Sequence, residues 1–396
     1  MSAASHPARL RIAKLVRYLF FLAVFTLVGL ELCLRFAMQF GPSSFRFRQY
    51  DPVLGVSLVP GREGVHRRCY DGYVSINSWG MRDRERALEK PDNVTRVALL
   101  GDSMIESVHV KPHETAAHLL EQKLNNQSGD SWEIMNFAAG GYSTYQEYLR
   151  YKQDVRKFKP DIVALVFYSN DLEANLEETV KSVGFRFPTP YLKKMPSGKF
   201  KAVPPRKPPY YDLTAWLTDH SATFFFAYRA YHLFAGPILF DTPQPELPSW
   251  LTPETAHYRY LDPDDPTSRK AWEVTEHVLD RLLQQVRADG AELMILDWGY
   301  DLGTNPWWAP LPNSRGQVPG SFDPYHSSKW IKRYGESRGV PTFDLAHHIG
   351  RYVAANQLKR PYLSFSCDQH FNPQGQQVLA DRMFQAFRSS GLRTAR

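Results

Sequence analysis

Four short polar segments of this chain carry side chains from which an acyl-transfer site can be built. They are Gly101-Asp102-Ser103, Asn136 to Gly141, Ser169-Asn170-Asp171 and Asp368-Gln369-His370. The first three each follow a short apolar run that is typical of a buried strand. Parallel strands end at one edge of their sheet, so this order predicts a nucleophile, oxyanion donors and a base at that edge.

The nucleophile and its base are the first requirement. A serine hydroxyl attacks poorly at neutral pH unless a base takes its proton. Ser103 is the candidate nucleophile and His370 the candidate base, with Asp368 placed to hold one ring N–H. Taken singly, the serine is also explained by a turn and the histidine, in a polar loop before the last helix, by a solvated surface.

Oxyanion donors are the second requirement. The backbone N–H of Ser103, the N–H of Gly141 and the side-chain amide of Asn170 are the candidates. Gly140 offers an N–H of the same kind, since glycine lets the backbone come close to a ligand. The glycine pair is also typical of a simple turn, and Asn170 of a helix cap.

Alternating strands and helices must position these residues. Strands are expected at 96–100, 132–137, 161–167, 291–296 and 342–344, and helices at 114–124, 144–158, 268–288, 326–338 and 373–389. This alternation predicts a parallel sheet with helices on both faces, a three-layer α/β/α sandwich. A strand order of 2-1-3-4-5 would place the strand of Ser103 between the other two donor strands.

At these residues the chain resembles the SGNH (GDSL) hydrolase superfamily. The four segments match its four blocks over about residues 48–179 and 270–390, and residues 76–83 resemble an arm found before the first block in membrane-anchored bacterial members. The resemblance implies a flavodoxin-like sheet, Ser103 as nucleophile, Gly141 and Asn170 in the oxyanion hole, and Asp368 with His370 completing a triad.

The chain departs from the family pattern at two places. Many members space the last pair as Asp-x-x-His, whereas one residue separates Asp368 from His370 and Cys367 stands three before the histidine. Ser169 replaces a glycine that often precedes the asparagine. The first departure weakens the match of Asp368 to the family's orienting acid more than it weakens the matches of Ser103 and His370.

The amino terminus carries a basic tail and an apolar run. We expect a cytoplasmic tail at 1–17, a transmembrane signal anchor at 18–40, an arm at 41–93 and the hydrolase domain at 94–396. Four basic residues and no acid precede the apolar run, which favours the tail inside and the body outside the cytoplasm. A cleaved signal peptide is the alternative, and a buried hairpin helix in a soluble protein a more remote one.

An insertion at about 180–267 interrupts the alternation. It is rich in proline, which central strands do not accept, and it includes the aromatic run 224–231. Phe224, Tyr228 and Tyr231 share a helical face. Ordinary packing onto the body explains that face, and a lid or an acyl-chain contact surface is the functional alternative.

Charge and cysteines limit the other functions. The net charge is +7, and the four basic residues of the tail leave only +3 for residues 18–396, so no nucleic-acid partner is expected. The three cysteines form no metal-binding spacing, and we expect no metal and no organic cofactor. Cys69 and Cys367 form one disulfide outside the cytoplasm or remain two free thiols.

The sequence therefore predicts a membrane-anchored serine esterase that cleaves O-acyl esters outside the cytoplasm. Its expected partners are an ester or acylated-glycan substrate and the membrane itself. An O-acyltransferase or deacetylase acting on cell-envelope polysaccharide would use the same residues. A non-catalytic, membrane-tethered binding module is the remaining alternative.

Overall fold

The computed structural model divides the chain into two compact units. The first comprises Met1–Phe47 and Pro208–Asp241, and the second Arg48–Lys207 and Thr242–Arg396. The described residues are 6–37, 46–67, 70–127, 131–168, 170–176, 188–231, 248–249, 251, 258–298, 318–359 and 363–392. The candidate site residues Ser103, Gly141, Asn170, Asp368 and His370 all belong to the second unit.

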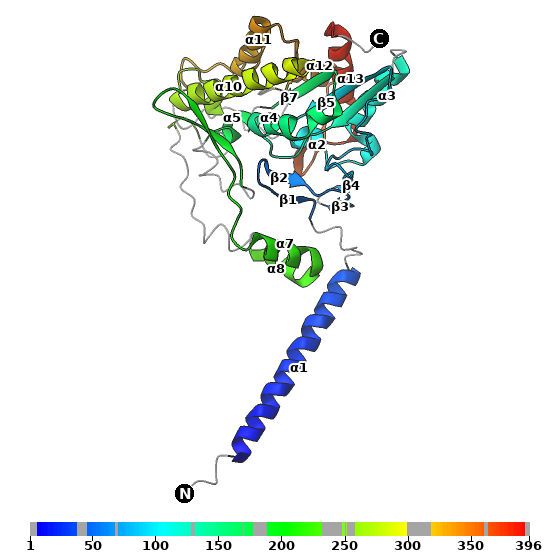
Figure 1. Cartoon of the computed structure of the whole chain (residues 1–396), viewed down its shortest axis with the longest axis vertical. Helices are drawn as coiled ribbons and strands as arrows, with labels where there is room; N and C mark the ends of the chain where they lie inside the picture. Colours follow the sequence, from blue (N-terminus) through cyan, green and yellow to red (C-terminus); the bar gives the residue numbers. More distant parts are fainter. Residues whose placement is uncertain are drawn as a thin grey trace. The chain divides into compact units, whose positions relative to one another are not determined.

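A parallel five-stranded sheet forms the centre of the second unit. Its strands are β5 (Val94–Leu100), β6 (Ser131–Asn136), β7 (Ile162–Phe167), β10 (Glu292–Asp297) and β11 (Thr342–Asp344). Across the sheet they lie in the order β11-β10-β7-β5-β6, and every neighbouring pair is parallel. This is the order 2-1-3-4-5 along the chain, so the predicted topology is confirmed, with β5 between β6 and β7. Figure 1 labels the neighbouring strands β5 and β7.

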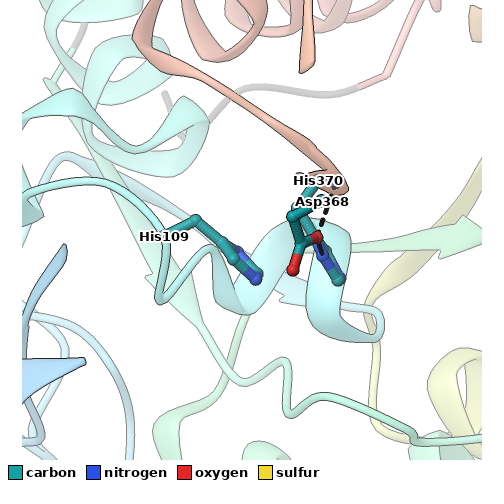
Figure 2. A group of neighbouring side chains, drawn as sticks. All are labelled: His109, Asp368 and His370. Atoms are coloured by element: carbon teal, nitrogen blue, oxygen red, sulfur yellow. Dashed lines mark hydrogen bonds and ion pairs between the residues drawn. The ribbon is translucent and has the colours of Figure 1, made fainter. Parts of the chain in front are cut away.

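Four short antiparallel strand pairs accompany the sheet in the described residues. They are β1 (Arg48–Asp51) with β2 (Gly55–Leu58), β3 (Glu63–Arg67) with β4 (Asp71–Ser75), β8 (Tyr191–Lys194) with β9 (Phe200–Val203), and β12 (Ser364–Phe365) with β13 (Asp368–Phe371). The last pair corrects one expectation. His370 does not lie in a loop but in β13, because backbone pairing with β12 extends that segment (Figure 2).

Helices cover both faces of the sheet, as predicted. They are α2 (Ser103–Glu106), α3 (Ala116–Gln127), α4 (Thr144–Gln153), α5 (Asn170–Ala174), α10 (Pro266–Ala288), α11 (His326–Arg338), α12 (Leu345–Ala355) and α13 (Pro373–Ser389), with 3-10 turns η2 (Pro112–Glu114) and η3 (Val155–Phe158). The helix expected at 144–158 is split, because the chain tightens into η3 before Lys159 turns left-handed. Helix α12 was not predicted, although Asp344 caps it by accepting the N–H of His347 at 2.8 Å.

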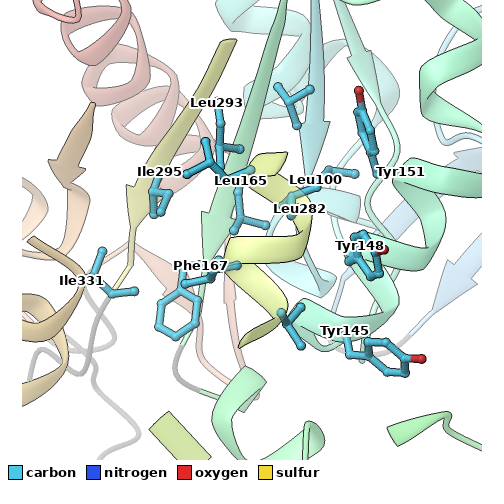
Figure 3. Packing of buried hydrophobic residues seen from close by; sticks show 14 of the residues in the cluster. Leu100, Tyr145, Tyr148, Tyr151, Leu165, Phe167, Leu282, Leu293, Ile295 and Ile331 are labelled. Atoms are coloured by element: carbon cyan, nitrogen blue, oxygen red, sulfur yellow. The ribbon is translucent and has the colours of Figure 1, made fainter. Parts of the chain in front are cut away.

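Two hydrophobic clusters lie on opposite faces of the sheet. Along β7, Val163, Leu165 and Phe167 belong to one cluster, while Ala164 and Val166 belong to the other. Successive side chains of a strand point to opposite faces, so a run that is apolar at every position is buried on both sides. Figure 3 shows the first cluster, where side chains of β5, β7 and β10 meet those of α4 and α10. The three-layer sandwich follows from this two-sided burial.

The segment that precedes β5 is anchored to the sheet unit by buried side chains. Met81 is fully buried in the first cluster. The guanidinium of Arg82 is also buried and donates to the backbone oxygens of Glu106 at 3.0 Å and Val110 at 2.6 Å. These contacts connect the expected arm to the end of the turn that begins at Ser103 and to the segment that follows it.

The first unit contains three described helices: α1 (His6–Ala37), α7 (Tyr211–His220) and α8 (Ala222–Ala230). Within α1, the 26 residues Arg11–Phe36 form a helix long and apolar enough to cross a membrane, a property that a signal sequence near the amino terminus shares. The aromatic run of the insertion is helical over α8. Other parts of the insertion, residues 180–187 among them, lie outside the described residues.

The cysteines are placed in part. Cys33 is a free thiol on α1, and Cys367, directly before β13, is disulfide-bonded. Cys69 lies outside the described residues, as does Ser169.

Candidate active site

Ser103 occupies the first position of a one-turn helix at the end of β5. Asp102 caps this turn, because its Oδ1 accepts the N–H of Met104 at 2.9 Å. The turn closes at Ser107, which has a left-handed backbone with a φ of 54°. A strand that passes directly into such a short turn presents the serine at the carboxyl edge of the sheet, where parallel α/β folds bind ligands.

His370 reaches this serine from the other end of the chain. Its Nε2 lies 2.8 Å from Ser103 Oγ, although 267 positions separate the two residues in sequence. Its Nδ1 bonds the buried carboxylate of Asp368. Because residues two apart in a strand share a face, the Asp-x-His spacing places carboxylate and imidazole side by side in β13. The structure thus brings all three expected side chains together.

The two glycines after β6 have different environments. A Cβ on Gly140 would lie 2.3 Å from the Arg48 guanidinium and 3.1 Å from Ser103 Cβ, so a larger residue there would displace the Arg48 side chain. The N–H of Gly140 donates to the Glu106 carboxylate, which removes it from the set of free oxyanion donors. Gly141 is exposed, has open space around it and adopts a φ of +83°, a conformation that favours glycine.

Asn170 begins α5 at the end of β7, on the other side of β5. Its Nδ2 donates to Asp102 Oδ2 at 2.9 Å. An amide nitrogen carries two hydrogens, so this bond occupies one and leaves the second as a donor toward a ligand. Asp102 is therefore shared between the turn of Ser103 and the side chain of Asn170. Burial raises the pKa of Asp102, while the bonds from Met104 and Asn170 act in the opposite direction.

Sequence reasoning did not identify the ion pair beneath the glycine loop. Glu106 is 1% exposed, and its Oε2 accepts from Arg48 Nη2 at 2.7 Å. Arg48 Nη1 also donates to the backbone oxygen of Gly140 at 2.7 Å. The pair holds the loop that carries Gly141 against the turn that carries Ser103. No local motif reveals it, because Arg48 and Glu106 are 58 residues apart in sequence.

A second histidine, also not predicted, stacks on His370. The ring of His109 lies 3.8 Å from that of His370 with an interplanar angle of 15°. Tyr70 packs edge-on against His109, with centroids 4.9 Å apart. Burial, followed by the charge of a protonated His370, lowers the pKa of His109 to about 2. His109 therefore presents a neutral ring face to His370 throughout the neutral pH range.

His109, Asp368 and His370 also form a group whose ligand atoms lie within 4.8 Å of one another (Figure 2). Imidazole binds a metal through a lone pair in the ring plane. The two stacked rings are nearly parallel, and both nitrogens of His370 already face Asp368 and Ser103. The arrangement fits a hydrogen-bonded relay with a stacked support better than it fits a cation site.

Two fully buried carboxyl groups lie behind Asn170. Burial raises the pKa of Glu147 on α4 and of Asp171 on α5 well above their ordinary values, and the proximity of the two groups raises the pKa of Glu147 further. Asp171 Oδ2 accepts from Thr144 Oγ1 at 3.1 Å. Burial and mutual proximity therefore both disfavour the charged forms of these two groups.

The geometry agrees with the family comparison. The model of the GDSL-like lipase/acylhydrolase family matches residues 99–378. The chain belongs to this family, and it is an SGNH-type serine hydrolase that acts on ester bonds.

Two acetylxylan esterases are among the solved structures to which the chain is similar. AlAXEase is 16% identical, with 74% of this chain and 98% of that chain covered at a TM-score of 0.40. Axe2 from Geobacillus stearothermophilus is 10% identical, with 77% and 99% covered at a TM-score of 0.40. TesA is 10% identical, with 74% and 98% covered at a TM-score of 0.39. No curated protein matches the chain.

Proposed function

We propose that the chain hydrolyses O-acyl esters through a triad of Ser103, His370 and Asp368. The observation that carries this proposal is the 2.8 Å approach of His370 Nε2 to Ser103 Oγ, with Asp368 bonded to the other ring nitrogen. Asp368 fixes the tautomer in which Nδ1 carries a proton and Nε2 is free to act as a base.

The reaction then runs in two halves. Ser103 Oγ attacks the ester carbonyl while His370 takes the proton of the hydroxyl. The N–H groups of Ser103 and Gly141, together with the side-chain amide of Asn170, stabilise the tetrahedral oxyanion. His370 gives the proton to the departing alcohol, leaving an acyl-serine. Water, deprotonated by the same histidine, attacks the acyl-serine, and the proton returns to Ser103 as the acid leaves.

We further propose that α1 is a signal anchor and that the hydrolase acts outside the cytoplasm. The cluster of basic residues before the apolar helix, without an acid, favours an inside position for the tail. A disulfide-bonded Cys367 is consistent with an oxidising compartment. A carboxyl-terminal alkaline phosphatase fusion that is inactive in intact cells would contradict this orientation.

Substitution of the nucleophile tests the triad. We expect Ser103→Ala to lower kcat on a chromogenic acetyl ester by at least about 10³-fold, because both His370 and the oxyanion donors are left without a nucleophile. A fluorophosphonate probe should label the wild type and not this variant. Ser366→Ala, an exposed serine just before Asp368, is the matched control and should keep full activity and labelling. Undiminished hydrolysis by Ser103→Ala would remove the proposal.

A further inference from the structure

Helix α7 in the first unit exposes a stripe of large apolar side chains. Leu213 and Trp216 are each 57% exposed and stand three positions apart, on one face of the helix. Tyr210, which precedes the helix, is 80% exposed. Exposed apolar groups gathered in this way mark a contact surface, and tryptophan and tyrosine are enriched where a membrane meets water.

The neighbouring helix α8 is tied to α1 by the carboxylate of Glu31. This carboxylate accepts the N–H groups of Ala222 and Thr223, each at 2.8 Å, and the hydroxyl of Ser221 at 3.0 Å. The two N–H groups are among those that an α-helix leaves unpaired at its amino end. Glu31 therefore adds a second cap to α8, beside Ser221, whose Oγ accepts the N–H of Phe224 at 3.1 Å.

Arginines complete the attachment. Arg35 pairs with Glu31 at 2.7 Å and donates to the backbone oxygen of His220, the last residue of α7. Arg46, which follows α1 in the chain, pairs with Asp219 at 2.6 Å and donates to the hydroxyl of Tyr211 at 2.8 Å. Both helices of the pair are thus fixed to the carboxyl-terminal end of α1.

The position of Glu31 along α1 sets the depth of this attachment. Tyr18, the first residue after the basic tail, lies thirteen residues before Glu31, which corresponds to about 20 Å of helix. The hydrocarbon layer of a bilayer is about 30 Å thick. If the basic tail stays at the inner surface, Glu31 and the amino end of α8 reach the outer part of the bilayer. A carboxylate at that depth is stabilised by its partners in α8 and by Arg35.

We propose that α7 and α8, residues 208–231, form an interfacial hairpin that lies in the outer leaflet of the membrane, with Leu213 and Trp216 among the lipid chains and headgroups. The occupant of the exposed stripe is the bilayer itself. This inference rests on the proposed placement of α1 in the membrane, and it is independent of the catalytic chemistry.

Depth-dependent quenching tests the hairpin. The full chain is reconstituted in phosphatidylcholine vesicles and labelled with an NBD fluorophore at a single cysteine, while phospholipids with a doxyl group near the headgroup act as quencher. The wild type carries the label at Cys33, the free thiol of α1. Leu213→Cys in a Cys33→Ala background carries it on the hairpin, and Lys332→Cys in the same background, 72% exposed on α11, is the water-exposed control.

We expect blue-shifted, quenched emission at positions 33 and 213, and emission typical of water at position 332. Quenching at 33 without quenching at 213 overturns the hairpin and leaves the anchor intact, whereas no quenching at 33 overturns both. Adding Glu31→Ala to the Leu213→Cys protein should reduce quenching at 213 by at least half, since α1 loses the carboxylate that binds the amino end of α8. Unchanged quenching in that protein would reject Glu31 as the attachment. Esterase activity should stay unchanged in each labelled protein, which shows that the catalytic unit is folded.

Discussion

Replacing Asp102 tests how the site orients its oxyanion donor. The carboxylate of Asp102 uses one oxygen to cap the turn of Ser103, through Met104 N at 2.9 Å, and the other to hold Asn170 Nδ2, also at 2.9 Å. Asp102→Ala removes both bonds. The side chain of Asn170 is then free to rotate away from the oxyanion. The turn of Ser103 keeps its backbone hydrogen bonds, from Glu106 N to Asp102 O at 2.9 Å and from Ser107 N to Ser103 O at 3.0 Å.

The expected loss follows from the strength of the orienting bond. A hydrogen bond to a charged group contributes about 1.5–3 kcal/mol, which corresponds to a fall in kcat of roughly 10- to 150-fold if Asn170 loses its orientation. Complete loss of an oxyanion donor costs about 10² to 10³ in kcat, so Asn170→Ala sets the upper limit. Asp102→Asn should lie between the wild type and Asp102→Ala, because an amide offers one acceptor where two are needed.

A double-mutant cycle on kcat for a chromogenic acetyl ester separates this role from a general loss of structure. If Asp102 acts through Asn170, the Asp102→Ala/Asn170→Ala double variant should match Asn170→Ala within about twofold, which is far from additivity. Asp344→Ala, which removes a comparable cap from α12, is the matched control and should leave kcat unchanged. Additive losses in the double variant would refute the reasoning.

Two further predictions concern His109 and Glu173. His109→Ala should lower kcat about fivefold without changing KM, because a stacked aromatic pair contributes about 0.5–1.5 kcal/mol. His109→Phe should restore most of the rate, and equal rates for the alanine variant and the wild type would contradict the stacking role. Desolvation raises the pKa of Glu173, which is half-buried on α5, to about 7. A carboxyl group whose pKa is raised on folding destabilises the protein as pH increases from its unfolded pKa of 4.5 through 7, by up to about 3 kcal/mol. Glu173→Gln should therefore raise Tm at pH 8 and not at pH 4.5 in a thermal denaturation series, and an equal change at both pH values would argue against a desolvated anion.

Local sequence pattern was sufficient to predict the strands of the central sheet and most of the helices that cover it. The runs at 161–167 and 291–296 are apolar at every position but one, which is typical of a strand covered on both faces, and the structure places β7 and β10 within one residue of those limits. Helix α12 was missed, although Asp344 before it and the helical spacing of Leu345, Ile349 and Val353 are local signals of a helix. The two-residue pairing that converts the His370 segment into β13 depends on a partner strand, which periodicity in one segment does not reveal.

The contacts that shape the site lie beyond sequence reasoning. His109 stacks on His370 from 261 positions away, and the pair of Arg48 with Glu106 bridges the arm and the glycine loop. In neither pair does the sequence spacing between the two residues indicate a contact. The bond between Asp102 and Asn170 was also not foreseen, since the turn and cap tendencies of both side chains already explained them locally.

The sequence by itself indicated the class of fold and the candidate reactive side chains, because these depend on burial patterns and motifs carried by short segments, and the family resemblance that those motifs carry implied the order of the strands. Only the tertiary structure decided the surroundings of those side chains: the neutral ring behind His370, the carboxylate shared by Ser103's turn and Asn170, and the acid of α1 that caps α8. These are pairings between distant segments, and their energies arise from burial and orientation that exist only once the chain is folded.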